Sequence, residues 1–525
     1  MARQGRRGSQ KYDTALFPDP CCVNLEPYKP WIIESSREGI QMSTKSQNSF
    51  APVVRTMALL LILALSSSVL SACAKKPQEL QKTQEELEAM ARDLVLSMAG
   101  GEFEEARKHF DKKMSAAVSG AQLQEICEAT SGQAGKWINV SGTTFAEEQG
   151  YRVVYVKNLF ERGTLDIKVV FNNQGQVSGL WVGALESDAY TQPGYANPDL
   201  FEERELVVGQ GKWELPATLT MPRNAAAGEP VPAVVLVHGS GPSNRDETIG
   251  PNKPFKDLAW GLASRGIAVL RYDKRTKVHG AAFTSEEAAS FTVKEETIDD
   301  AVLAVKLLKT IDGVDPDRVF VVGHSLGATV GPRIAQACNP AEGSSSPDED
   351  SNADADTSIA GLVMMAPTAR NLADLMVEQM EYLANLDGQI DEKEAAQIQE
   401  ARAAADKIKS GSLKEGEVAL GAPKAYWDDL SAHDPVEIAK HLNLPILILQ
   451  GERDYQVTMV DLEIWKQALS GKPNVTIKTY PDLNHLFMSG SGKSTPDEYF
   501  VPSNLAEEVV ADIVDWVNSL NLHRK

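Results

Sequence analysis

The most informative stretch of the chain is VFVVGHSLG, residues 319–327. Its first four residues are apolar and predict a short buried strand, and residues 326–337 show the pattern of a helix. Between them, Gly323-His324-Ser325-Leu326-Gly327 has the form G-x-S-x-G. A glycine-rich turn between a strand and a helix raises a serine hydroxyl above the end of a sheet. The stretch therefore predicts Ser325 as a nucleophile.

Strand and helix patterns alternate on both sides of this turn, across residues 202–525. The predicted strands are 233–237, 267–272, 319–322, 362–366, 446–450 and 475–480, and the predicted helices are 255–265, 297–311, 326–337 and 506–520. Segments 204–208 and 213–221 predict an opening hairpin. The alternation predicts an α/β fold with a doubly wound, mostly parallel sheet.

Two insertions interrupt the alternation. Residues from about 370 to 441 are helical in pattern, rich in alanine, glutamate and lysine, and lie between two predicted strands. We predict that this segment forms a helical lid over the site. Residues 339–357 carry six acidic and no basic residues. Such a composition predicts a solvated, disordered loop.

A serine hydroxyl is a weak nucleophile at neutral pH and needs a base, which in turn needs an acid to orient it. On an α/β sheet of this kind the chain order is serine, acid, histidine. Asp454 follows the predicted strand 446–450, and His485 follows the strand 475–480. We therefore predict Asp454 as the acid and His485 as the base, with Glu452 as the second candidate acid and Asp461 as the third.

The developing negative charge on the attacked oxygen needs two backbone N–H donors. Leu326, directly after the nucleophile, is predicted to supply one of them. The other is expected from the loop His238-Gly239-Ser240-Gly241-Pro242, which follows the strand 233–237. We favour the N–H of Ser240, with Gly241 second. His238 is expected to hold this loop rather than to transfer protons.

Taken together, these stretches resemble the α/β-hydrolase superfamily over residues 202–525, and more narrowly the bacterial carboxylesterases of the EstD type. The stretches that carry the resemblance are 238–242, 245–248, 270–275, 323–327, 451–457 and 484–488. The resemblance implies hydrolysis of small carboxylic esters through an acyl-enzyme on Ser325, with no cofactor. Ala328, where glycine is common, and the acidic loop depart from the pattern. Asp273, Lys274 and Arg275 are expected to form structural hydrogen bonds and ion pairs.

Two other classes of function remain open on the residues alone. A serine peptidase, of the aminopeptidase or prolyl-oligopeptidase kind, shares this fold and would need a group that binds an amine or a carboxylate. The acids of the predicted lid, among them Glu378, Glu381 and Asp387, do not single one out. A non-catalytic surface binding lipoprotein would have no need of all three triad residues. Aromatic side chains of the lid could line an acyl pocket, although core packing is favoured; these are Tyr382, Tyr426 and Trp427.

A smaller domain is predicted to precede the α/β part. Residues 87–129 have helical spacing, and 151–158, 163–172 and 176–182 alternate as antiparallel strands do. We assign residues 87–184 to an α+β domain that resembles the NTF2-like fold, and residues 185–201 to a linker.

The N-terminal region has the form of an export signal. An apolar core from Met57 is followed by small residues and ends in Leu70-Ser71-Ala72-Cys73, which resembles the bacterial lipobox. The core is short for a membrane span. We predict a non-native or disordered extension at 1–41, a lipoprotein signal peptide at 42–72, lipidation of Cys73 and a tether at 73–86. The protein is then expected outside the cytoplasm, held to the membrane by its lipid anchor.

The composition excludes several partners and cofactors. Among 525 residues, 52 are basic and 73 acidic, which gives a net charge of −21. Nucleic acid is a poor partner for such a chain. Five cysteines exclude a scaffold built on disulfides. We predict no metal site, and the oligomeric state remains open.

Overall fold

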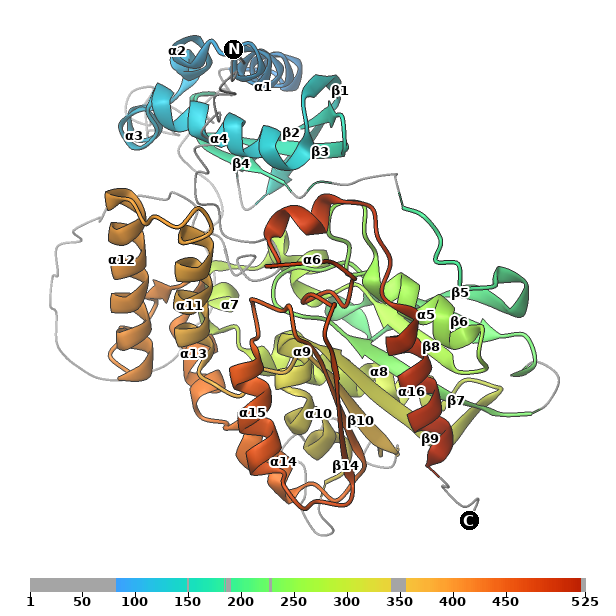
Figure 1. Ribbon diagram of the computed structural model, residues 1–525. Helices are drawn as coiled ribbons and strands as arrows, with labels where there is room; N and C mark the ends of the chain where they lie inside the picture. The colour runs from blue at the N-terminus through green and yellow to red at the C-terminus, as the bar shows by residue number, and fades with distance from the viewer. Residues whose placement is uncertain are drawn as a thin grey trace, which may run out of the picture.

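The computed structural model (Figure 1) describes residues 82–520, apart from 149–150, 184, 186–189, 226–228 and 341–355. The predicted extension, the signal peptide and Cys73 lie outside the described residues, as do most of the predicted tether and most of the acidic loop. Within the described ranges, none of the helices combines the length and the apolar composition that crossing a membrane requires.

The α/β part is built on an eight-stranded sheet, counted over the described residues, with the order β14-β13-β10-β9-β7-β8-β6-β5. Neighbouring strands from β14 to β8 run parallel, and β6 and β5 join antiparallel at one edge. The strands are β5 (Phe201–Val208), β6 (Leu215–Pro222), β7 (Val231–Val237), β8 (Ala268–Tyr272), β9 (Val314–His324), β10 (Gly361–Met365), β13 (Ile446–Gly451) and β14 (Val475–Tyr480). The predicted fold class is confirmed.

Helices cover both faces of this sheet (Figure 1). On the central strand β7, Val235 and Val237 pack into one core and Val234 and Leu236 into the other, because successive strand residues point to opposite faces. One face is covered by α5 (Pro254–Ala263) and α16 (Glu507–Ser519), and the other by α8 (Asp299–Lys309), α9 (Leu326–Thr329), α10 (Gly331–Cys338), α14 (Pro435–His441) and α15 (Met459–Ala468).

Two helices differ from their predicted form. The segment predicted as one helix at 326–337 is split at Val330, because Pro332 lacks the N–H that a continuous helix would use and its ring would meet the preceding turn. The helix predicted at 297–311 is entered through a π-helical turn, Lys294–Ile298, before α8 begins. Smaller elements α6 (Arg275–His279) and α7 (Ser285–Ser290) precede that turn.

The insertion between β10 and β13 is helical. It contains α11 (Leu372–Ala384), α12 (Glu392–Lys409), the short pair β11 (Val418–Ala419) and β12 (Ala422–Pro423), and α13 (Lys424–Ser431). Its first residues are held by the fully buried carboxylate of Asp461, which accepts the backbone N–H groups of Ala369 and Arg370 and pairs with the Arg370 guanidinium. The third candidate acid, Asp461, is thus an anchor of the lid.

The N-terminal domain is a helical layer on a four-stranded antiparallel sheet (Figure 1). Its elements are α1 (Gln84–Ala99), α2 (Phe103–Ala106), α3 (Lys112–Ala117), α4 (Gly120–Ala134), β1 (Trp137–Glu148), β2 (Tyr151–Phe160), β3 (Gly163–Phe171) and β4 (Val177–Val182). Strand β1 was not predicted from the sequence. It is an edge strand in which only Val140 is buried, so it lacks the alternation of apolar residues that indicates a strand.

The two domains share a packed contact. The short 3₁₀ turn Pro496–Phe500 of the α/β domain lies against α4, and Phe500 is buried within the core of the N-terminal domain. The linker is also held, because the Tyr190 hydroxyl donates to Asp257 on α5 and the Tyr195 hydroxyl donates to the carbonyl of Leu505. The contact at Phe500 lies on the same loop region that follows His485.

Candidate active site

The G-x-S-x-G turn connects β9 to α9 and holds Ser325 in an unusual conformation, with φ of 51° and ψ of −115°. The positions of Gly323 and Gly327 leave no room for a side chain. A Cβ at Gly323 would lie 2.4 Å from the carbonyl oxygen of Gly327, and a Cβ at Gly327 would lie 2.3 Å from that of Val237. Only glycine lets these backbones meet, so the turn can project the serine at the carboxyl end of the sheet.

Asp454 and His485 lie together on the loops that follow β13 and β14. Asp454 Oδ2 is 2.7 Å from His485 Nδ1, and both side chains are fully buried. The other oxygen of Asp454 accepts the backbone N–H groups of Gln456 and Val457. The second candidate acid, Glu452, is exposed. Of the three candidate acids, Asp454 is therefore the one that contacts the histidine.

The free nitrogen of His485 is the atom that a base would use. Its Nε2 is buried and has no hydrogen-bond partner among the residues that the structure describes. The His485 ring lies beside the nucleophile turn. Its centroid is 4.7 Å from the centroid of the His324 ring, and His324 Nε2 donates to the His485 carbonyl over 2.9 Å. Contacts between base and nucleophile are commonly long without substrate and tighten in the reacting complex.

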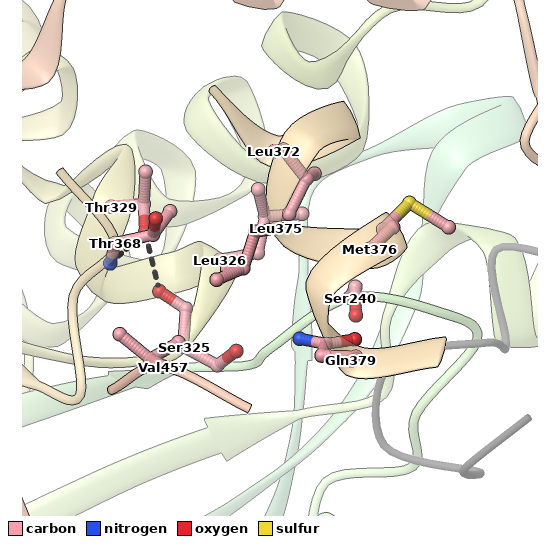
Figure 2. Close-up of a pocket in the computed structure, with 10 residues that line it drawn as sticks. All are labelled: Ser240, Ser325, Leu326, Thr329, Thr368, Leu372, Leu375, Met376, Gln379 and Val457. Atoms are coloured by element: carbon pink, nitrogen blue, oxygen red, sulfur yellow. Dashed lines mark hydrogen bonds between the residues drawn. The ribbon is translucent and has the colours of Figure 1, made fainter. Parts of the chain in front are cut away.

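Ser325 opens onto a small cavity of about 10 Å³ (Figure 2). The cavity brings Ser325 together with Leu326 and Ser240, the two residues predicted to donate to an oxyanion; Gly241 is not among the described residues that line it. The loop before Ser240 touches the nucleophile directly, since a Cβ at Gly239 would lie 3.2 Å from Ser325 Cβ. The remaining lining residues are Thr329, Thr368, Leu372, Leu375, Met376, Gln379 and Val457.

A buried ion pair that the sequence analysis did not assign joins three loops of the site. Glu247 Oε2 lies 3.1 Å from His324 Nδ1, and Glu247 Oε1 accepts the N–H of Gly239 over 2.8 Å. Burial lowers the pKa of His324, but the Glu247 carboxylate outweighs it and raises this pKa above 6.5. Burial raises the pKa of Glu247, and His324 outweighs that effect and lowers it below 4.5. His324 is therefore the cation of the pair and Glu247 the anion.

Lys274 forms the structural hydrogen bond and ion pair expected of it, but the sequence did not indicate that the hydrogen bond would reach the loop beside Ser325. Its neighbours Asp273 and Arg275 form the expected structural ion pairs, with Arg245 and Asp300. Lys274 instead donates to the carbonyl of Gly239 in the loop beside Ser325, over 2.7 Å. The sequence feature that could have indicated this contact is the charged run 273–275, which follows the carboxyl end of β8. That end of β8 lies at the same edge of the sheet as the nucleophile.

The remaining candidates lie apart from the cavity. His238 packs against Phe255 and Tyr272, and burial lowers its pKa to about 4, so it is neutral and holds its loop by packing. The lid acids pair with lid cations, Glu378 with Arg370 and Glu381 with Arg402. The lid aromatics are engaged in packing and hydrogen bonds: Tyr382 stacks on Tyr455, Tyr426 donates to Glu296, and Trp427 donates to the carbonyl of Ala419.

In the part of the chain that the structure describes, no group of three or more histidine, cysteine, aspartate or glutamate residues is arranged to hold a metal ion. The side-chain groups that the site offers for chemistry are the Ser325 hydroxyl, the His485 imidazole and the Asp454 carboxylate. Ser325 and the two residues predicted to supply backbone donors line the cavity, and the paired His485 and Asp454 lie on neighbouring loops outside its lining. Together they are the elements of acyl transfer.

The Glu247–His324 pair predicts a pH-dependent stability. Because folding raises the pKa of His324, its contribution is complete below about pH 6.5 and is lost as the pH rises through the folded-state pKa. The contribution of Glu247 is present above about pH 4.5 and is lost as the pH falls through its lowered pKa. We expect Glu247→Gln to cost about 3 kcal/mol of unfolding free energy near pH 6.

Near pH ~9 this difference should shrink or reverse, because the wild type then buries a carboxylate without its cationic partner. Urea unfolding of both proteins at the two pH values measures the effect. Glu202→Gln, which removes a partly exposed partner of Arg204, is the control and should cost less than about 1 kcal/mol at either pH. A cost of Glu247→Gln that does not change with pH would contradict the assignment of charges.

Comparisons with known proteins show the family to which the chain belongs. Residues 234–501 match the family described as "Alpha/beta hydrolase family", and residues 91–180 match "Protein of unknown function (DUF3887)". The chain is 38% identical over 423 residues to "Esterase EstD" of Thermotoga maritima, covering 81% of this chain and 93% of that protein.

Among the solved structures that the chain matches is a hyperthermophilic esterase from Pyrobaculum calidifontis, at 17% identity and a TM-score of 0.39 over 61% of this chain and 87% of that one. The esterase Est2 from Thermogutta terrifontis matches at 15% identity and a TM-score of 0.37, over 62% and 92%. Because residues 234–501 match the family model and most of the chain aligns with the Thermotoga maritima protein, this chain belongs to the α/β-hydrolase family and is a relative of the esterase EstD.

Proposed function

We propose that the protein hydrolyses carboxylic esters through an acyl-enzyme on Ser325. The observation that carries the proposal is the buried contact of 2.7 Å between Asp454 and His485 beside the nucleophile turn. It occurs in a chain that is 38% identical to a protein named as an esterase. The order of the three residues along the chain, serine, aspartate and histidine, is that of the family.

The reaction proceeds in two halves. His485 Nε2 takes the proton of Ser325 while the serine oxygen attacks the ester carbonyl, and the tetrahedral oxyanion accepts the N–H groups of Leu326 and Ser240. His485 then gives the proton to the departing alcohol. In the second half, His485 takes a proton from a water molecule as the water oxygen attacks the acyl carbonyl. His485 then returns this proton to the Ser325 oxygen as the acid leaves, which restores the serine hydroxyl. Asp454 orients the imidazole and stabilises its charged form in both halves.

We also propose that the acyl group is short. The cavity beside Ser325 measures about 10 Å³, which is close to the space that one water molecule needs. Its far wall comes from the lid helix α11 and consists of the apolar Leu372, Leu375 and Met376, with Gln379 beside them (Figure 2). Acetyl is the smallest of the common acyl groups, so it would move the α11 wall least. A longer acyl chain would have to displace the side chains of this wall.

Outside the cytoplasm, a lipid on Cys73 would hold this esterase to the membrane. The proposal is supported by the apolar run from Met57 and the lipobox-like Leu70–Cys73. The several acyl chains of a bacterial lipoprotein would give stable anchoring where one chain would be marginal.

Replacing the nucleophile is the direct test of the reaction. We expect Ser325→Ala to lower kcat for p-nitrophenyl acetate by about 10⁴- to 10⁶-fold with an unchanged circular dichroism spectrum. Ser264→Ala, on the outer end of α5, serves as the control and should keep full activity. Turnover that survives Ser325→Ala would remove Ser325 from its role, and faster cleavage of alanine or proline p-nitroanilides than of esters would make the protein a peptidase.

The acyl pocket is tested by enlarging it. Leu375→Ala should raise the ratio of kcat/KM for p-nitrophenyl butyrate over acetate by about 10-fold, because it makes room for two more methylene groups. Leu386→Ala, at a 37% exposed position at the far end of the lid helix, is the control and should leave the ratio unchanged. A ratio that stays the same in Leu375→Ala would show that the acyl group lies elsewhere.

The anchor is tested in a bacterial host grown with radiolabelled palmitate. The full chain should carry the label and sediment with membranes, and Cys73→Ser should lose both properties, because the sulfur of Cys73 is the atom to which the lipid is attached. Cys127→Ser, at a half-buried position in the folded part, should keep both. Equal labelling of the wild type and Cys73→Ser would contradict the proposed anchor.

A further inference from the structure

Lys274 is a buried cation that contacts the active-site loop without lining the cavity. Its side chain is 2% exposed, and its ammonium donates to the carbonyl oxygen of Gly239 over 2.7 Å. Burying an ammonium in a protein core is costly unless it is paired and hydrogen-bonded. The contact therefore needs an explanation beyond filling space.

The contacted oxygen belongs to the same peptide group as the N–H of Ser240. In a trans peptide the C=O and the N–H point in opposite directions. A donor that holds the Gly239 oxygen on one side therefore sets the direction of the Ser240 N–H on the other. Ser240 lines the cavity together with Ser325 and Leu326.

We infer that Lys274 is a positioning residue for the oxyanion: it fixes the Gly239–Ser240 peptide and polarises its N–H. This inference rests on the proposed function, in which that N–H binds the oxyanion. A cation on the carbonyl oxygen draws electron density from the peptide, so the N–H becomes a stronger donor. The gain is greater in the transition state than in the bound ester, because negative charge develops on the substrate oxygen as the tetrahedral oxyanion forms.

The preceding peptide is held from the other direction. The N–H of Gly239 donates to Glu247 Oε1 over 2.8 Å. Gly239 thus has an anion on its N–H and a cation on its C=O, and rotating either peptide would break a buried, charge-assisted hydrogen bond. A loop rich in glycine, which would otherwise be mobile, is in this way fixed before substrate arrives.

The charge on Lys274 has a partner that leads to the lid. Glu296 Oε1 lies 3.4 Å from the ammonium, and Glu296 also accepts the hydroxyls of Thr276 and Tyr426. Glu296 belongs to the π-helical turn before α8, an irregularity that is often found at functional sites. Tyr426 lies on α13 of the lid. The cation that holds the oxyanion loop is therefore itself held by a carboxylate tied to the lid.

The test compares Lys274→Met with the wild type. Methionine keeps most of the volume and removes the charge and the donor. We expect kcat for p-nitrophenyl acetate to fall by about 10- to 100-fold while KM stays within about twofold. The inhibition constant of phenylboronic acid, whose serine adduct is a tetrahedral anion, should weaken by a similar factor.

Two further variants separate positioning from stability. Arg275→Met removes the neighbouring buried cation, which pairs with Asp300 and does not touch the loop; it should lower Tm but leave kcat unchanged. Lys274→Gln keeps a neutral donor and should recover part of the lost kcat, and it decides the question if Lys274→Met does not fold.

Three results would overturn the inference: a kcat of the folded Lys274 variant within about threefold of the wild type, a rise in KM that accounts for the whole loss, or an equal loss of kcat in Arg275→Met. Failure of the wild type to turn over any ester would instead refute the proposed function, so the two failures can be told apart.

Discussion

The geometry of the site depends on the buried ion pair between Glu247 and His324. His324 directly precedes the nucleophile and donates to the carbonyl of His485, while Glu247 accepts the N–H of Gly239 beside the oxyanion position. One pair of charges, 3.1 Å apart, thus connects the loops that supply the nucleophile, the base and the oxyanion donor. These loops follow different strands of the sheet, and the backbone alone would not fix their positions relative to one another.

Such an arrangement has a cost that the rest of the fold must offset. Both members of the pair are buried. Glu247 and Ser325 also have positive φ angles, of 50° and 51°, which residues other than glycine rarely adopt. The parallel sheet compensates through the apolar cores on its two faces. Strain and buried charge concentrate where the reaction needs rigid donors, and the apolar core supplies the stability elsewhere.

Local patterns made much of this predictable from the sequence. The strands of the sheet are apolar runs bounded by turns, and the chain order of Ser325, Asp454 and His485 pointed to a contact that the structure makes between the last two. The pairing of Glu247 with His324 was missed, and the partner of Lys274 was not predicted, because both depend on residues distant in sequence. Nothing in the run at 270–275 distinguishes Lys274, which reaches Gly239, from Arg275, which pairs with Asp300. The edge strand β1 was missed because it lacks a buried face.

The central claim is that Ser325 carries the acyl group during turnover, and trapping that intermediate tests it most directly. The wild-type protein would be mixed with p-nitrophenyl acetate, quenched in acid within milliseconds and analysed by mass spectrometry after digestion. The account predicts a mass gain of one acetyl group on the peptide that contains Ser325. Hydrolysis that proceeds with no acetylated peptide, or with the label on another residue, would contradict it.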